Sequence, residues 1–186
     1  MKLMIDPGHG GSDPGAVGPG GARECDIALA VSMMTAGLFA DSERHTASLT
    51  RWTDKFVELD DRCAIANNRD ADVFVSIHCN AAEAASATGF EVFTSPGWTE
   101  ADPIATAIWQ DLRAAFPDMR GRLDSSDGDP DKEARFRVLV GTDMPAVLVE
   151  LGFISNPEEE KRLADPAFQT FAAYSIGTTL REVLDG

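Results

Sequence analysis

Hydrophobic residues fall into short runs that alternate with stretches of helical periodicity along the chain. Six of these runs have the length and the apolar or alternating content of β-strands. They are residues 2–5, 47–50, 72–77, 89–94, 135–140 and 146–151. The third and sixth runs are almost continuously apolar, which is typical of strands that are covered on both faces of a sheet.

Between the runs, apolar side chains recur every three or four positions, which predicts amphipathic helices. Asp102 and Asn156 each precede a proline and are predicted N-caps. Because helices alternate with strands, we expect right-handed crossovers and a single α/β domain over residues 1–186. Its sheet should be mostly parallel, with helices on both faces. The predicted helices occupy residues 24–40, 59–69, 102–116 and 156–163 and a final segment whose stripe is Phe168, Ala172, Ile176, Leu180 and Leu184.

The charge balance narrows the possible partners. The chain has 31 acidic and 16 basic residues, for a net charge of −15. Nucleic acids and anionic membranes are bound through basic patches, so we expect neither as a partner. No apolar run approaches the ~20 residues of a membrane span, and the N-terminus lacks the apolar segment of a signal peptide. We therefore expect a chain made in the cytoplasm and not inserted in a membrane.

Three cysteines, at positions 25, 63 and 79, are too few and too scattered for a disulfide framework. None belongs to a CxxC pair, so a thiolate zinc site is not expected either. We interpret them as small buried side chains. If the strand at 72–77 continues, Cys79 points to the face opposite His78.

Polar residues with metal chemistry follow three of the predicted strands. The first strand runs into "DPGHGG" with His9, the third ends at His78, and the last ends near Glu150. In open α/β sheets, ligands bind beyond the carboxyl ends of the strands. Histidine and glutamate are the residue types that bind zinc and assist its catalysis.

Glu24 is a fourth candidate. It lies three residues before Ile27 and seven before Val31, so on a helix it shares their apolar stripe. A carboxylate on the buried side requires a partner, and a metal would serve. A capping or dipole-stabilising role is the alternative. Likewise, a histidine at the end of a strand, taken alone, is more often a hydrogen-bonded structural residue than a metal ligand.

His45 and Trp98 are of residue types that often have functional roles. His45 lies in the polar stretch "DSERHTA", and we expect it to be exposed and without function. Trp98, in "SPGWTE", is predicted to lie in a loop, with a role in lining a sugar or peptide groove as the alternative. The segment 121–134 is rich in Gly, Asp, Ser and Pro and is predicted to be a loop that is solvated or contacts substrate.

Seven segments taken together resemble one family. They are "MIDPGHGGSDPGA", "RECDIAL", "LTRWTD", "RCAIANN", "VFVSIHCNA", "GFEVF" and "PAVLVELGFISNPEEEKRL". In this order they are similar to the zinc-dependent N-acetylmuramoyl-L-alanine amidases, which occur among bacterial wall hydrolases and phage endolysins. The resemblance covers nearly the whole chain.

The resemblance implies a set of roles. His9, Glu24 and His78 would be the ligands of one Zn²⁺ ion per chain, and Glu150 the catalytic carboxylate. The fold would be a twisted six-stranded sheet. The substrate would be peptidoglycan, cleaved between N-acetylmuramic acid and L-alanine of the stem peptide, at the cell wall or in the periplasm. Asp6 is a candidate to orient a zinc-binding histidine. We expect a monomer.

Other functions remain open at this point. A zinc peptidase or a deacetylase of other wall amides would use the same residue types. A zinc-dependent wall-binding module without catalysis is a second alternative, and a metal-free protein with structural histidines is a third. The sequence does not distinguish a phage lysis enzyme, released by a phage system, from a cellular remodelling enzyme.

Overall fold

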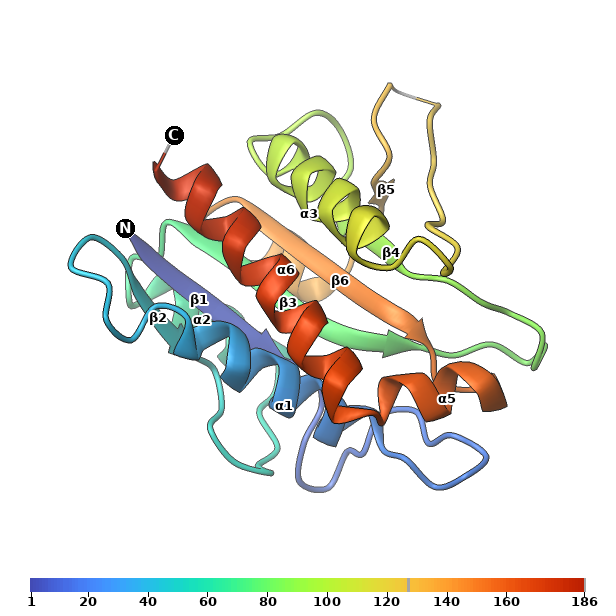
Figure 1. Cartoon of the computed structure of the whole chain (residues 1–186). Helices are drawn as coiled ribbons and strands as arrows, with labels where there is room; N and C mark the ends of the chain where they lie inside the picture. Colours follow the sequence, from blue (N-terminus) through green and yellow to red (C-terminus); the bar gives the residue numbers. More distant parts are fainter. Residues whose placement is uncertain (127, 186) are drawn as a thin grey trace.

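A mixed sheet with the strand order β2-β1-β3-β6-β4-β5 runs through the middle of the molecule (Figure 1). The structure, a computed structural model, describes residues 1–126 and 128–185. β4 is antiparallel to β6, and the other neighbouring strands are parallel. The predicted mostly parallel α/β sheet is therefore confirmed. The strands are β1 (Lys2–Pro7), β2 (Thr46–Leu49), β3 (Val73–Asn80), β4 (Glu91–Thr94), β5 (Lys132–Glu133) and β6 (Ala146–Phe153).

Helices cover both faces of this sheet, but unequally. The helices are α1 (Glu24–Gly37), α2 (Leu59–Asn67), α3 (Asp102–Ala115), α4 (Arg137–Val140), α5 (Pro157–Leu163) and α6 (Pro166–Asp185). The long helices α1, α3 and α6 pack on one face, where α6 lies between the other two (Figure 1). The short helices α2 and α4 pack on the opposite face.

The alternation of side chains along the central strands divides the core in two. Ile5, Val75 and Val149 belong to the large cluster beneath α1, α3 and α6. Met4 and Leu148, at positions of the other parity, belong to the smaller cluster beneath α2 and α4. Side chains two residues apart on a strand share a face. The even-numbered residues at the ends of β3 and β6 therefore lie on the thinly covered face.

One predicted strand is wrong. Residues 135–140 do not form a strand, because Arg137–Val140 form the short helix α4. Val138 and Leu139 are buried next to each other, whereas Phe136 and Val140 are 40% and 46% exposed. Burial of adjacent residues suits one face of a helical turn and not the alternation of a strand. The fifth strand of the sheet is instead the pair Lys132–Glu133, within the segment predicted to be a loop.

The predicted N-caps have different outcomes. Asn156 caps α5, since its side chain accepts hydrogen bonds from the backbone N–H groups of Glu158 and Glu159. The prediction for Asp102 is wrong. It lies inside the first turn of α3, where its carboxylate accepts hydrogen bonds from Thr99 just outside the helix. The stripe predicted for α6 is confirmed as buried.

His45 is not exposed as predicted. It is 4% exposed, and its Nε2 lies 2.9 Å from Oδ1 of Asp185 at the end of α6. The three cysteines are confirmed as buried free thiols. Across residues 1–126 and 128–185, none of the helices combines the length and hydropathy that crossing a membrane would require.

Candidate active site

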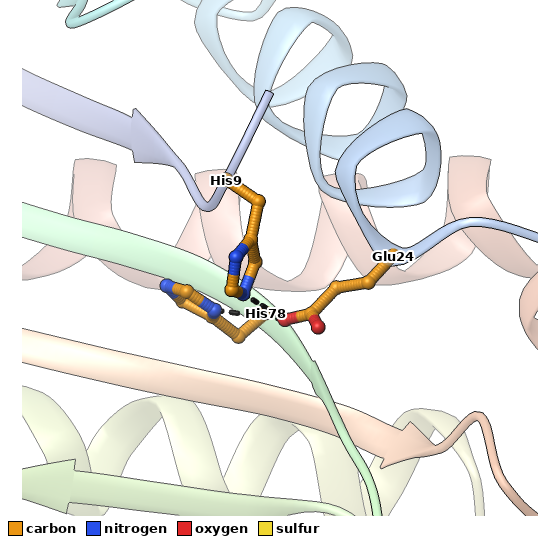
Figure 2. A group of neighbouring side chains, drawn as sticks. All are labelled: His9, Glu24 and His78. Atoms are coloured by element: carbon orange, nitrogen blue, oxygen red, sulfur yellow. Dashed lines mark hydrogen bonds and ion pairs between the residues drawn. The ribbon is translucent and has the colours of Figure 1, made fainter. Parts of the chain in front are cut away.

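Three side chains from separate elements converge at the carboxyl end of β1 and β3 (Figure 2). His9 follows β1, Glu24 is the first residue of α1, and His78 lies near the end of β3. Nε2 of His9 and Nδ1 of His78 lie 3.1 Å and 2.8 Å from the same oxygen, Oε1 of Glu24. One potential ligand atom from each residue lies within 4.8 Å of the other two. The three candidate ligands are thus brought together as the resemblance implied.

The glycine-rich turn after β1 makes this approach possible. His9 has a φ of 58°, a conformation that is uncommon for residues other than glycine. A Cβ atom on Gly8 would overlap the imidazole ring of His78. A Cβ on Gly15 would lie 2.6 Å from Oε2 of Glu24 and 2.7 Å from the ring of His9. The glycines of "DPGHGGSDPG" therefore leave room for side chains that arrive from other elements.

Glu24 is held in place by the backbone as well as by the histidines. It is 4% exposed, as its place on the stripe of α1 predicted. Its Oε1 accepts a hydrogen bond of 3.1 Å from the N–H of Cys79, and its Oε2 accepts one of 2.8 Å from Ala16. Burial raises the pKa of this carboxyl group, but the contacts with His78 and His9 outweigh it and bring the pKa well below its usual range. Glu24 is therefore a fixed anion.

Asp13 orients His9. Nδ1 of His9 lies 2.7 Å from Oδ2 of Asp13, while Nε2 faces Glu24. Burial lowers the pKa of His9, but Glu24 and Asp13 more than offset this and raise it to about 9. A hydrogen bond from Nδ1–H to a carboxylate leaves Nε2 as the atom for a metal. The spacing of four residues within "HGGSD" is the signal that sequence reasoning missed.

Asp6 was a candidate to orient a zinc-binding histidine, but its carboxylate makes other contacts. Its carboxylate accepts hydrogen bonds from Thr50, Arg62 and Ser76 at 2.5–2.8 Å. Arg62, in turn, donates to the carbonyl oxygens of Pro7 and His9. Asp6 therefore supports the backbone of the turn that carries His9, and Asp6 and Arg62 also line the cleft beside the site.

Glu150 lies beside His78 on the neighbouring strand. The two residues are paired in the register of β3 and β6, so their side chains leave the same face of the sheet. Oε2 of Glu150 is buried and has no hydrogen-bond partner in the described chain. Burial raises the pKa of Glu150 to about 7. The proximity of His78 lowers it, and Glu24 and Glu91 raise it further. Such an uncompensated buried carboxyl group is unusual away from functional sites.

Glu91 occupies the position opposite Glu150 on β4. It is 4% exposed, and its carboxylate is bound by the side chains of Arg122, Lys132 and Asn80. Two cations thus neutralise Glu91, whereas Glu150, on the next strand, forms no ion pair with a Lys or Arg in residues 1–126 and 128–185. Sequence reasoning missed this network, because Lys132 and Arg122 lie in the segment predicted to be a simple loop.

The site opens into a cleft of about 450 Å³ on the thinly covered face of the sheet. His9, Asp13, His78 and Glu150 line its polar part, and α2 and α4 contribute to its walls. Trp98 is 77% exposed in a loop, as predicted, and is not among the residues that line this cleft. The cleft lining also includes Phe56, Val57, Glu58, Leu59, Phe136, Arg137, Val138 and Leu148.

Comparison with known proteins identifies the family. The sequence profile of a family described as N-acetylmuramoyl-L-alanine amidase matches residues 3–182. The chain belongs to this family. It is 33% identical to N-acetylmuramoyl-L-alanine amidase AmiC of Neisseria meningitidis, over 98% of this chain and 52% of that protein. It is 36% identical to the sporulation-specific N-acetylmuramoyl-L-alanine amidase of Bacillus subtilis, over 90% of this chain and 62% of that protein. The chain thus spans about half to two thirds of these curated relatives.

The fold agrees with solved structures of the amidase family. The structure of N-acetylmuramoyl-L-alanine amidase AmiC2 of Nostoc punctiforme superposes with a TM-score of 0.89 at 32% identity, covering 100% of this chain and 98% of that one. The twisted six-stranded fold implied by the resemblance is therefore confirmed. Amidases of this family are generally zinc-dependent, and two imidazoles with one carboxylate are a donor set that zinc accepts. The convergence of His9, Glu24 and His78 fits such an ion.

Proposed function

We propose that this chain is a zinc-dependent N-acetylmuramoyl-L-alanine amidase, and that residues 1–186 form its catalytic domain. Its substrate would be peptidoglycan, cleaved at the amide between N-acetylmuramic acid and L-alanine of the stem peptide. The observation that carries the proposal is the convergence of His9, Glu24 and His78 beside the buried, unpaired carboxyl group of Glu150. Family membership supports the choice of substrate.

His9, Glu24 and His78 would hold one Zn²⁺ ion per chain. Three protein ligands are the usual number at a catalytic zinc site. When bound, zinc supplies a Lewis acid that polarises the amide carbonyl and lowers the pKa of water to about 7. The protein itself holds the metal-binding side chains in position. Asp13 holds the tautomer of His9, and the backbone N–H groups of Ala16 and Cys79 hold Glu24.

Glu150 is assigned the general acid–base role. Burial raises the pKa of Glu150 to about 7 in the metal-free protein, so this carboxyl group accepts a proton more readily than an exposed glutamate, as a general base requires. In the proposed reaction, Glu150 accepts a proton from the attacking water and then donates it to the amine nitrogen of L-alanine. Glu150 is paired with His78 in the ladder between β3 and β6, and both residues line the cleft in which the scissile bond would lie.

The cleft is suited to an extended, amphipathic substrate. Phe56, Leu59 and Phe136 are exposed apolar side chains that line it together with Arg137. Apolar walls with a few polar groups are typical of ligand clefts. We propose that these walls contact the stem peptide. We also propose that the chain works as a monomer at the cell wall or in the periplasm.

Digestion of purified peptidoglycan tests the proposal. The zinc-loaded protein is incubated with intact sacculi, with and without a chelator, and the products are read by mass spectrometry. An amidase leaves intact glycan and releases peptides with a free N-terminal alanine, and the chelator stops the release. Muropeptides that keep their stem peptides but lose an internal peptide bond would identify a peptidase instead. Loss of N-acetyl groups would identify a deacetylase. Retention on sacculi without any cleavage would leave only a wall-binding module.

A further inference from the structure

A second group of potential metal ligands lies outside the cleft. It consists of Asp102 at the start of α3 and Asp129 and Asp131 in the loop before β5. One carboxylate oxygen from each of the three lies within 4.8 Å of the other two. We call these residues the acidic triad. No histidine or cysteine belongs to it among the residues that the structure describes.

The acidic triad is buried and incompletely satisfied. Asp102 and Asp131 are each 2% exposed. One oxygen of each already has protein partners. Oδ2 of Asp131 accepts a hydrogen bond of 2.8 Å from Thr94, and Oδ2 of Asp102 accepts hydrogen bonds from the N–H and hydroxyl groups of Thr99.

Two of the remaining oxygens of the triad lack partners. Oδ1 of Asp131 and Oδ1 of Asp129 are buried, and neither receives a hydrogen bond in the part of the chain that the structure describes. In the same part of the chain, no Lys or Arg forms an ion pair with any member of the triad. Buried carboxylates are normally paired with a cation or coordinate a metal. An unpartnered, almost completely buried carboxylate oxygen within the triad therefore indicates a missing positive charge.

We propose that Asp102, Asp129 and Asp131 bind a calcium ion that is distinct from the ion of the cleft. Two oxygens that bind one Ca²⁺ ion, each at about 2.4 Å, lie at most about 4.8 Å apart, and the triad satisfies this limit. The set consists only of oxygen donors, which suits a hard cation and not zinc. Mg²⁺ usually keeps several waters and uses one or two carboxylates, so three converging carboxylates favour Ca²⁺.

The proposed ion would fasten the loop before β5 to the edge of the sheet. The triad joins this loop to α3, and Thr94 of β4 is hydrogen-bonded to it as well. The next residue after Asp131 is Lys132, whose ammonium group lies 3.0 Å from Oε1 of Glu91. Glu91 is the cross-strand neighbour of Glu150. Calcium would therefore fix Lys132, one of the two cations that neutralise Glu91, without touching the cleft itself.

A calcium titration tests this proposal in the zinc-loaded protein. Isothermal titration calorimetry should detect one Ca²⁺ ion per chain in addition to zinc. At a calcium concentration about 100-fold above the dissociation constant, the melting temperature should rise by about 5–10 °C. The absence of both binding heat and a shift in melting temperature would overturn the proposal, and the triad would then hold a shared proton. An equal shift with Mg²⁺ alone would overturn the assignment to calcium.

Asp131→Asn separates a lost ligand from a damaged fold. Without calcium, this variant should melt at or above the temperature of the wild type, because it relieves carboxylate repulsion. With calcium, the wild type should gain stability and the variant should not. Glu100→Gln is the matched control, since Glu100 is exposed, lies two residues from Asp102 and loses the same charge. A calcium response that persists in Asp131→Asn would overturn the proposed ligand set.

Discussion

The two faces of the sheet differ in what they contribute. The face beneath α1, α3 and α6 carries the larger apolar cluster, with Val75, Val149 and Ile176 fully buried. The opposite face has only the short helices α2 and α4, and beyond them the strands open into the cleft. His78 and Glu150 lie on this second face because of their parity along β3 and β6.

Within one strand, therefore, residues that stabilise the core alternate with residues that line the cleft. Val149 and Glu150 are adjacent in β6, yet one packs in the main core and the other lines the cleft with its charge unpaired. The well-packed face beneath α1, α3 and α6 stabilises the fold. This stabilisation offsets the unfavourable burial of the carboxyl group of Glu150 on the other face. The contrast predicts that substitutions on the two faces have opposite effects on stability and on activity.

The largest effect is expected for Glu150→Gln on the open face. If Glu150 is the general acid–base group as proposed, its loss should lower kcat by about 10²–10⁴-fold, while the zinc content stays that of the wild type. Turnover of peptidoglycan and metal analysis of the same sample measure both quantities. Glu83→Gln, at an exposed position, is the control and should leave both unchanged. A parallel loss of zinc and activity would instead make Glu150 a metal ligand.

On the covered face, Ile176→Ala should lower the free energy of unfolding by about 2–5 kcal/mol, because it opens a cavity beneath α6. The turnover number per folded molecule should stay the same. Urea denaturation and initial rates below the transition measure the two effects. Phe171→Ala on the same helix is the control, since Phe171 is 64% exposed and should change stability little. A loss of turnover in folded Ile176→Ala would contradict the separation of the faces.

The stability of the metal-free protein should depend on pH through the buried carboxyl group of Glu150. Burial raises the pKa of Glu150 in the folded state to about 7, above its ordinary value, so the folded state holds the proton more tightly than the unfolded chain. The wild type should therefore lose stability relative to Glu150→Gln as the pH rises from about 4.5 to about 7. Above this range, the free energy of unfolding of the wild type should be about 3 kcal/mol lower than that of Glu150→Gln, and below it the two values should be equal. Melting curves of both proteins at pH 5 and pH 8 measure it, and a constant difference would contradict the assigned environment.

Asp13→Asn should have the smallest of these effects. The amide still occupies the position beside Nδ1 of His9 but no longer accepts its proton as a carboxylate does. Zinc affinity should fall by about 10–100-fold, with recovery of turnover at high zinc concentration. Competition with a chromogenic chelator measures the affinity. Asp41→Asn, at an exposed position remote from the site, should bind zinc as the wild type does.

Much of the fold was predictable because the core strands carry a strong local signal. The runs at 72–77 and 146–151 became β3 and β6, the centre of the sheet. The error at 135–140 arose because α4 is a single turn, too short for helical periodicity to be distinguished from alternation. The two-residue strand β5 has no apolar pattern at all, since it consists of Lys132 and Glu133.

The convergence of the candidate residues was predictable, but the contacts that support them were not. His9 and His78 follow predicted strands and Glu150 lies near the end of another, so the general rule for α/β sheets predicted that they would lie close together. Glu24 was found through its stripe with Ile27. The roles of these four residues remain proposals. Asp6 was the candidate to orient a histidine, and Asp13 was missed, because side-chain direction in a glycine-rich turn depends on φ values that the sequence does not specify.

Long-range contacts explain the other failures. His45 is buried against Asp185, which is 140 residues away along the chain, and no local pattern indicates this contact. In the same way, the acidic triad joins Asp102, at the start of α3, to Asp129 and Asp131 in the loop before β5. A contact between polar residues that are distant in sequence produces no periodic pattern in the sequence. A buried apolar face of a helix or strand does produce one.

The pairing of His78 with Glu150 in the ladder between β3 and β6 has a practical consequence for protein engineering. The spacing between these two groups is set by backbone hydrogen bonds inside the sheet and not by the connections around the cleft. Loops at the rim can therefore be exchanged or lengthened to change which substrate the cleft accepts, while the relative position of His78 and Glu150 is retained.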